Sequence, residues 1–358
     1  MPLERRRLGR TGVEVCPIGL GGIATMKTSV EDAYRTMKTA LDLGVDFVDT
    51  GQGYGDSQQK IGAILHTLGC RTEVFIATKS AVRSRKKMLA AIDESLEALK
   101  TDYIDLYQFH VLLSPEDYDQ RVNNGVLDAL CESRERGKVR FLGVTGHHFG
   151  ALRHALESFP FDTVQVAYNM GCERAETEVF ATACEKDAGI IAMKPLAGGF
   201  LVNPKSATGT PKPGAEAMTA QRALEFVLSC DDVSVAIPGM ASPEEVRENF
   251  AVRTVSLSTA ERNAMVEETM RFVGESFCRG CTYCMPCTAN EWRFMIPEIL
   301  RLEGWYTRYG YEEWARAQYA KQKVNASACQ KCGDCEPRCP YGIPIRDRLA
   351  RAHEILSS

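Results

Sequence analysis

Short apolar segments rich in β-branched residues alternate with amphipathic segments eight times before the chain becomes rich in cysteine. The short segments have the length of strands, and the amphipathic segments repeat apolar residues at the three-to-four-residue spacing of a helix. One helix is predicted between Ser29 and Gly44 and another between Ser57 and Gly69, because serine often begins a helix and glycine often ends one. The predicted strands begin at Val15, Asp46, Val74, Tyr103, Val139, Thr163, Ile190 and Val233.

Two later helices are predicted from their first turns. The letters SPEE at residues 242–245 combine a serine N-cap, a first-turn proline and a glutamate at the capping-box position. A second capping box, Ser258 with Glu261, precedes a helix expected to end near Val273. Beyond it cysteines, aromatics and arginines accumulate, which predicts a small domain under helical cover with a mostly inorganic core. The expected domains are therefore residues 1–273 and 274–358.

The regular alternation of strands and helices predicts a parallel sheet with right-handed crossovers. Eight strand–helix units in roughly 250 residues suit a closed (β/α)8 TIM barrel. A doubly wound open sheet is the alternative. No G-x-G-x-x-G follows the first predicted strand, where GLGGIA at residues 19–24 is only a weak look-alike, and this favours the barrel.

Composition and charge narrow the class of partner. The 358 residues are 44% hydrophobic and 25% charged, with a formal net charge of −4, which gives no reason to expect nucleic acid or an anionic membrane as a partner. The longest apolar runs, such as residues 190–193, have only the length of a strand. The first residues, MPLERRRLGR, do not resemble a secretory signal. We therefore expect a cytoplasmic protein.

Four polar residues follow or end successive predicted strands. Asp49 ends one strand, Tyr54 lies in the loop after it, and Lys79 and His110 end the next two strands. Active sites of parallel barrels form at the carboxyl ends of the strands, so all four side chains should reach one mouth. Taken singly, a tyrosine or histidine near a strand end is usually structural. Together the four residues indicate a catalytic site.

The residue types suit the reduction of a carbonyl group. Tyr54 can give a proton to the developing alkoxide, although the pKa of a free tyrosine is about 10. A neighbouring ammonium, Lys79, is expected to lower that pKa, and Asp49 would keep the lysine charged and in place. His110 can donate a hydrogen bond to the carbonyl oxygen.

The motifs that surround these four residues resemble the aldo-keto reductase family. GVDFVDTGQGYG, FIATKS, TDYIDLYQFH, GVTGHH, VQVAYN, MKPLAGG and IPGMASPEEVREN follow one another in the order of that family across residues 3–255. The resemblance implies a catalytic tetrad of Asp49, Tyr54, Lys79 and His110. It also implies NAD(H) or NADP(H) bound across the barrel mouth without a Rossmann fold.

The same resemblance implies the residues that would bind the cofactor. Thr145 and Gln165 would hold the carboxamide, the PLAGG loop the pyrophosphate, and Asn249 the adenine. Two departures from the usual pattern matter. Met193 replaces a stacking tyrosine. At the positions that would receive a 2′-phosphate, Gly239 and Met240 replace a Lys-Ser pair and Glu245 replaces an arginine. A carboxylate would repel a 2′-phosphate, so NADH becomes a serious candidate. The full implied set is Thr145, Gln165, Met193, Lys194, Leu196, Gly198, Pro238, Gly239, Met240, Glu245 and Asn249.

Eight of the fourteen cysteines crowd into two motifs near the end of the chain. In a cytosolic protein such a cluster indicates metal ligation rather than disulfides. CQKCGDCEPRCP matches the C-x2-C-x2-C-x3-C-P run of bacterial ferredoxins, and CRGCTYCMPC differs from it by one residue. Structural zinc is the alternative, although zinc usually takes two separated pairs of cysteines. The candidate ligands are Cys278, Cys281, Cys284, Cys287, Cys329, Cys332, Cys335 and Cys339.

The resemblance to two-cluster ferredoxins implies two 4Fe–4S clusters whose fourth ligands are exchanged between the motifs. Cys278, Cys281, Cys284 and Cys339 would then hold one cluster. Cys329, Cys332, Cys335 and Cys287 would hold the other. The clusters would either stabilise the small domain or exchange electrons with a partner protein, and the sequence favours neither.

These patterns together predict an NAD(P)-dependent oxidoreductase that acts on a small aldehyde, ketone or alcohol. One alternative is an electron-transfer protein that uses the barrel to hold a nicotinamide or to dock a partner. Another is non-redox acid–base chemistry, such as elimination or isomerisation, at the same four residues. The complete tetrad favours carbonyl reduction over both alternatives.

Overall fold

The computed structural model describes residues 3–173, 175–199, 201–202, 218–252, 256–273, 278–279, 283–285, 287, 295–307, 310–339 and 341–358. Its contacts divide the chain into two compact units. The first contains Met1–Pro195 and Leu224–Ser256, and the second contains Leu196–Ala223 and Leu257–Ser358. Residues 196–223, which sequence analysis assigned to the barrel, are thus grouped with the C-terminal part of the chain.

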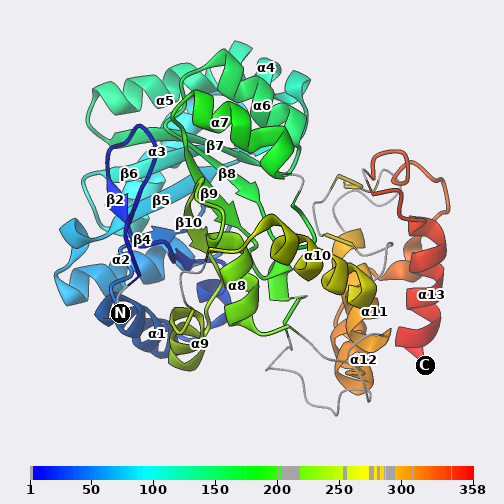
Figure 1. The fold of residues 1–358 in the computed structure, drawn as a ribbon. Coiled ribbons are helices and arrows are strands. Elements are labelled where there is room, and N and C mark those ends of the chain that lie inside the picture. The colour runs from blue at the N-terminus through cyan, green and yellow to red at the C-terminus, as the bar shows by residue number, and fades with distance from the viewer. Residues whose placement is uncertain are drawn as a thin grey trace. The chain divides into compact units, whose positions relative to one another are not determined.

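The first unit is built around a parallel sheet of eight strands, as expected for a (β/α)8 barrel (Figure 1). The strands follow one another in chain order around the sheet. Backbone hydrogen bonds from Gly19 N to Ala236 O (2.8 Å) and from Gly21 N to Pro238 O (2.9 Å) join the first strand to the last. The strands are β3 (Leu20–Gly21), β4 (Phe47–Asp49), β5 (Phe75–Ser80), β6 (Ile104–Leu112), β7 (Val139–Gly146), β8 (Thr163–Ala167), β9 (Gly189–Met193) and β10 (Val233–Ile237).

The strands form because their residues are apolar or β-branched and covered on both faces. Every residue of β4, β5, β8, β9 and β10 is buried, as in other parallel sheets enclosed by helices. Seven of the eight predicted strands begin within one residue of the observed ones. The prediction for the first strand was wrong, because Val15 belongs to a two-stranded antiparallel hairpin of β1 (Arg6–Arg7) and β2 (Glu14–Val15).

The helices begin and end where the capping residues predict. The Ser29 hydroxyl accepts a hydrogen bond from Asp32 N (3.0 Å) at the start of α1, and Gly69 ends α2 in the left-handed conformation, with φ of 68°. The helices of this part of the chain lie outside the strands (Figure 1). They are α1 (Val30–Asp42), α2 (Ser57–Leu68), α3 (Arg85–Leu99), α4 (Pro115–Asn123), α5 (Val126–Glu135), α6 (Phe149–Ser158), α7 (Ala181–Glu185), α8 (Ala220–Leu228) and α9 (Pro243–Phe250).

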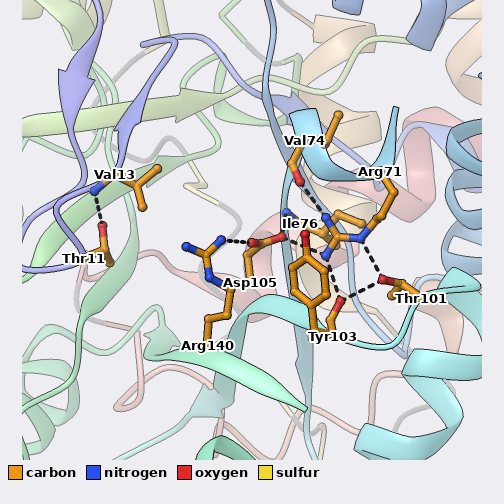
Figure 2. A network of polar contacts seen from close by, with 9 residues as sticks. All are labelled: Thr11, Val13, Arg71, Val74, Ile76, Thr101, Tyr103, Asp105 and Arg140. Carbon is orange, nitrogen blue, oxygen red and sulfur yellow. Dashed lines mark hydrogen bonds and ion pairs between the residues drawn. The ribbon is translucent and has the colours of Figure 1, made fainter. Parts of the chain in front are cut away.

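A polar network ties together the amino ends of β5, β6 and β7, which lie opposite the expected active site (Figure 2). The Arg71 guanidinium donates to Val74 O (2.8 Å), Tyr103 O (2.8 Å) and the Asp105 carboxylate (2.9 Å). Asp105 also accepts from Arg140 (2.5 Å) and from the backbone N–H of Ile76 (3.0 Å). Polar groups at this end of a barrel serve stability rather than chemistry.

The described residues of the second unit form four further α-helices. Its core is an apolar cluster centred on Ile299, Leu302, Leu349 and Ala352, with Cys284, Cys287 and Cys335 at its edge. The core thus contains apolar side chains beside the candidate cysteine ligands, and the predicted helical cover is present, while a mostly inorganic core stays a prediction. The helices are α10 (Thr259–Val273), α11 (Ile296–Thr307), α12 (Glu312–Ala320) and α13 (Ile345–Ser357).

Among the helices of the described residues, none is both long and apolar enough to cross a membrane.

Candidate active site

Two of the predicted catalytic residues form a buried ion pair at the carboxyl ends of β4 and β5. The Lys79 ammonium donates to both carboxylate oxygens of Asp49 (2.6 and 2.7 Å) and to Thr50 O (2.8 Å). Asp49 is 2% exposed and Lys79 is 1% exposed. Burial would lower the pKa of Lys79, but Asp49 and the Tyr54 hydroxyl outweigh it and raise that pKa. Lys79 is therefore a fixed positive charge at neutral pH.

Tyr54 lies in the loop after β4, next to this charge. The Lys79 Nζ atom is 5.0 Å from the centroid of the Tyr54 ring. Gly51 allows this close approach, because a Cβ atom there would lie 3.2 Å from Lys79 Cγ and 3.6 Å from Tyr54 Cδ1. Burial raises the pKa of the Tyr54 hydroxyl and Lys79 opposes that rise. Lys79 thus acts in the direction that sequence analysis expected, but burial outweighs it and the net direction of the Tyr54 pKa is upward.

Gln52 connects the loop that carries Tyr54 to β5 and to α3. Its backbone N–H donates to Lys79 O (3.0 Å), and its side-chain oxygen accepts from the Ser80 hydroxyl (2.7 Å). Its side-chain amide donates to Glu94 of α3 (2.6 Å). Sequence analysis did not single out Gln52, since a glutamine in a glycine-rich loop carries no distinctive signal.

His110 lies on β6, beside the strand that carries Lys79. Burial, Lys79 and Arg121 lower the pKa of its imidazole to about 3. The ring is therefore neutral at pH 7 and can donate one N–H to a carbonyl oxygen. Asp49, Tyr54, Lys79 and His110 all come from the carboxyl ends of three adjacent strands, β4, β5 and β6.

Two residues that are predicted to bind the nicotinamide lie side by side on neighbouring strands. Thr145 of β7 and Gln165 of β8 are register partners, and both side chains are almost fully buried. Within the described residues, Thr145 Oγ1 and Gln165 Oε1 have no hydrogen-bond partner. Buried polar atoms are normally paired, so this hydroxyl and this amide oxygen suit a ligand with its own donors and acceptors, such as a carboxamide.

The other predicted cofactor residues lie after β9 and β10. Met193 ends β9, and Lys194 follows it with a positive φ of 54°. Leu196 and Gly198 belong to the second unit, in a turn where Gly199 N donates to Leu196 O (2.9 Å). After β10, Pro238 accepts the backbone bond from Gly21 that joins the first and last strands.

The start of α9 carries the residues on which the prediction about NADH depends. Met240 is buried, Gly239 is exposed and Asn249 is 3% exposed. The Glu245 carboxylate accepts from Ala241 N (2.7 Å), while the Ser242 hydroxyl accepts from Glu245 N (3.3 Å). The Glu245 side chain therefore reaches back to the residue before the N-cap, and its carboxylate lies at the amino end of α9.

Four of the predicted metal ligands line one cavity in the second unit. Cys329, Cys332 and Cys335 of the last motif meet Cys287 of the first motif there, together with Arg338 and Arg346. This is the set that the crossed arrangement of ferredoxins implies for one cluster. In the described part of the chain, no three metal-binding side chains converge closely enough for a single metal ion.

Three of the other four candidate cysteines lie in the described residues. Cys284 is buried, and Cys278 and Cys339 are partly buried against the apolar cluster of the second unit. Cys281 lies outside the described residues.

Comparison with known proteins agrees with both parts of this arrangement. Residues 17–220 match the model of the aldo/keto reductase family, and residues 277–344 match that of the 4Fe-4S dicluster domain. An L-galactose dehydrogenase of Arabidopsis thaliana is 30% identical, over 75% of this chain and 92% of the relative. A 6-dehydroglucose reductase of Novosphingobium aromaticivorans is 31% identical, over 58% of this chain and 73% of the relative.

A solved structure shows the same fold. The aldo-keto reductase of Bacillus halodurans in its holo form superposes with a TM-score of 0.64, at 24% identity, over 75% of this chain and 96% of its own. The strand order, the family match and the similarity to the plant dehydrogenase lead to one conclusion. The chain belongs to the aldo/keto reductase family and carries a 4Fe-4S dicluster domain of the ferredoxin type at its C-terminal end.

Proposed function

We propose that this oxidoreductase reduces an aldehyde or ketone, or oxidises the corresponding alcohol, with NAD(H) or NADP(H) and with Tyr54 as the proton donor. The observation that carries the proposal is the buried Asp49–Lys79 pair, whose ammonium faces the Tyr54 ring at 5.0 Å. A bound nicotinamide would supply the hydride for the carbonyl carbon. The orphaned polar atoms of Thr145 and Gln165 support its placement at the mouth of β7 and β8.

The protein's own residues would supply the proton and stabilise the charge that develops. His110, neutral at pH 7, donates a hydrogen bond to the carbonyl oxygen and orients it. As negative charge grows on that oxygen, the Tyr54 hydroxyl transfers its proton and becomes a phenolate. The Lys79 ammonium stabilises this phenolate, and Asp49 prevents the lysine from losing its own proton. The raised pKa of Tyr54 keeps the hydroxyl protonated before the reaction, as a proton donor requires.

We further propose a preference for NADH over NADPH. The Glu245 carboxylate lies at the start of α9, where a 2′-phosphate would need positive charge and would instead meet repulsion. Arg247 is the nearest cation on that helix that could serve instead, and it lies 3.5 Å from Glu244 in an exposed ion pair. A phosphate there would meet the Glu245 carboxylate and an arginine that is already paired with Glu244.

We propose two 4Fe–4S clusters in a domain of residues 274–358, which follows in the sequence a barrel domain of residues 1–273. The cavity lined by Cys287, Cys329, Cys332 and Cys335 supports the crossed arrangement of ligands. An electron-transfer role is a second candidate function of this domain, and one observation favours it. Cys332 and its neighbours Gln330 and Lys331 are exposed, so a cluster held there would lie close to solvent and to a partner protein.

Substitution of the proton donor tests the main proposal. We expect Tyr54→Phe to bind NADH and NADPH like the wild type but to lose turnover by roughly 10²–10⁴-fold, the usual contribution of general acid catalysis. The assay follows oxidation of each nicotinamide without any other electron acceptor, using 4-nitrobenzaldehyde, glyceraldehyde and an aldohexose. The sugar is included because two relatives are named for sugar substrates. Turnover of Tyr54→Phe close to that of the wild type would exclude Tyr54 as the donor.

A further inference from the structure

The strand that carries His110 is irregular at that residue. Phe109 of β6 pairs in register with Val144 of β7, and the next pair is Leu112 with Gly146. Two residues of β6, His110 and Val111, therefore stand opposite one residue of β7, Thr145, which makes a bulge in β6. Bulges re-aim side chains and are common beside active sites, and they leave backbone groups that need other partners.

Arg121 of α4 supplies those partners. Its Nη1 donates to His110 O (2.6 Å) and its Nη2 donates to Val111 O (3.0 Å). The side chain is only 1% exposed, which makes Arg121 one of the largest fully buried side chains of the described residues. A planar guanidinium with fixed donors can hold two adjacent carbonyl groups in one geometry, which a lysine cannot do.

Asp117 anchors Arg121 to the beginning of its helix. The Asp117 carboxylate lies 3.1 Å from Arg121 Nη2 and accepts from the backbone N–H of Leu113 (3.2 Å). Its own N–H donates to the hydroxyl of the N-cap residue Ser114 (3.2 Å). Arg83 also donates to the Asp117 carboxylate, so Asp117 joins two arginines, and Arg121 connects it to the bulge of β6.

In the described residues no hydrogen bond fixes the Nδ1 side of the His110 imidazole. Its Nδ1 atom is buried and has no hydrogen-bond partner within the described part of the chain. The direction of the ring therefore depends on the backbone from which it projects, and Arg121 holds that backbone. Arg121 lies behind the strand and donates to carbonyl groups, so it acts on the reaction only through His110.

We propose that Arg121 is a positioning residue for His110, fixing the bulge of β6 so that the imidazole meets the substrate carbonyl. The inference rests on the proposed function, in which His110 orients that carbonyl. Small displacements of a catalytic group have large effects, since a shift of about 1 Å can reduce the rate by roughly 10²-fold. The expected signature is a loss of kcat with little change in cofactor binding.

A double-mutant cycle tests this role. Arg121→Lys and Arg121→Met are made in the wild type and in His110→Ala, and single turnovers of 4-nitrobenzaldehyde are measured with saturating NADH and with saturating NADPH. In the wild-type background we expect the rate to fall by roughly 10–100-fold. In the His110→Ala background we expect no further loss, because the group that Arg121 positions is already gone.

Arg71 provides a matched control. It also donates to two backbone carbonyls and one aspartate, but at the opposite ends of the strands (Figure 2). Arg71→Lys should lower the melting temperature while leaving the single-turnover rate unchanged. Should Arg121→Met fail to fold, Arg121→Lys and Asp117→Asn still test the proposal, because both should lower the rate only when His110 is present.

The outcomes distinguish a failure of the role proposed for Arg121 from a failure of the role proposed for His110. If the Arg121 variants lower the rate equally with and without His110, Arg121 has only a structural role and the positioning proposal is refuted. If His110→Ala alone retains the wild-type rate, the proposed role of His110 fails first, and with it the role of Arg121. A full effect of Arg121 that disappears in His110→Ala supports both.

Discussion

Replacement of Lys79 by methionine separates what the buried ion pair contributes to stability from what it contributes to catalysis. The substitution keeps the length of the side chain but leaves the Asp49 carboxylate, 2% exposed, without its countercharge and without two of its hydrogen bonds. Removing one partner of a buried pair destabilises a protein by about 3–5 kcal/mol. At roughly 2–4 °C per kcal/mol, the melting temperature of the barrel should fall by about 6–20 °C.

The loss should depend on pH in a defined direction. Burial raises the pKa of Asp49, and Lys79 is the main group that opposes this rise. Without Lys79 the folded-state pKa lies further above the unfolded value of about 3.9, so protonation favours the folded state. The stability that a protonated Asp49 contributes is present at low pH and is lost as pH rises through the folded-state pKa. Lys79→Met should therefore be less destabilised at about pH 5 than at about pH 8.

Circular dichroism during heating and nicotinamide oxidation are the two measurements. In the double variant Lys79→Met with Asp49→Asn the buried charge is gone, so we expect part of the melting temperature to return while turnover stays low. A single variant that melts within about 2 °C of the wild type at pH 8 would refute the electrostatic reasoning. A double variant that regains turnover would refute the role of Lys79 in stabilising the Tyr54 phenolate.

Three further predictions concern the cofactors. Thr145→Val should weaken nicotinamide binding by roughly 2–10-fold, the loss of one hydrogen bond of about 0.5–1.5 kcal/mol, and unchanged dissociation constants would contradict the placement of the carboxamide. Glu245→Gln keeps an oxygen for the Ala241 N–H but removes the charge, so NADPH should bind up to roughly tenfold more tightly relative to NADH, and an unaltered ratio would show that Glu245 is remote from the phosphate. Anaerobically purified protein should contain about eight iron and eight sulfide per chain, and stoichiometric zinc without sulfide would favour the zinc alternative.

Sequence patterns predicted most of the barrel because its signals are local. A buried parallel strand is a short apolar run, and the capping residues Ser29, Ser242 and Ser258 mark the starts of helices in the chain itself. The first barrel strand was missed because it has only two residues, Leu20 and Gly21, and owes its position to pairing with distant strands. No local period can reveal such a strand.

The candidate site also contains residues that local sequence signals indicate and residues that only the folded structure brings into contact. Asp49, Lys79 and His110 could be predicted as candidates because each lies at or near the carboxyl end of a recognisable strand. Arg121 was not, because it lies in a polar helix and its importance comes from a bulge ten residues earlier in the chain. The apolar cluster of the second unit also escaped prediction, since Ile299, Leu349 and the cysteines meet only after the chain has folded.

Closure of the barrel has a consequence for synthesis of the protein. The bonds from Gly19 and Gly21 reach residues 236 and 238, and Arg6 donates to the carbonyls of Leu228 (2.6 Å) and Val233 (2.7 Å). A nascent chain emerging amino end first must therefore keep the edge of β3 unpaired until β10 has left the ribosome. At roughly 5–20 residues per second, this exposes a parallel edge for about 10–40 seconds, the interval in which such chains depend on chaperones or aggregate.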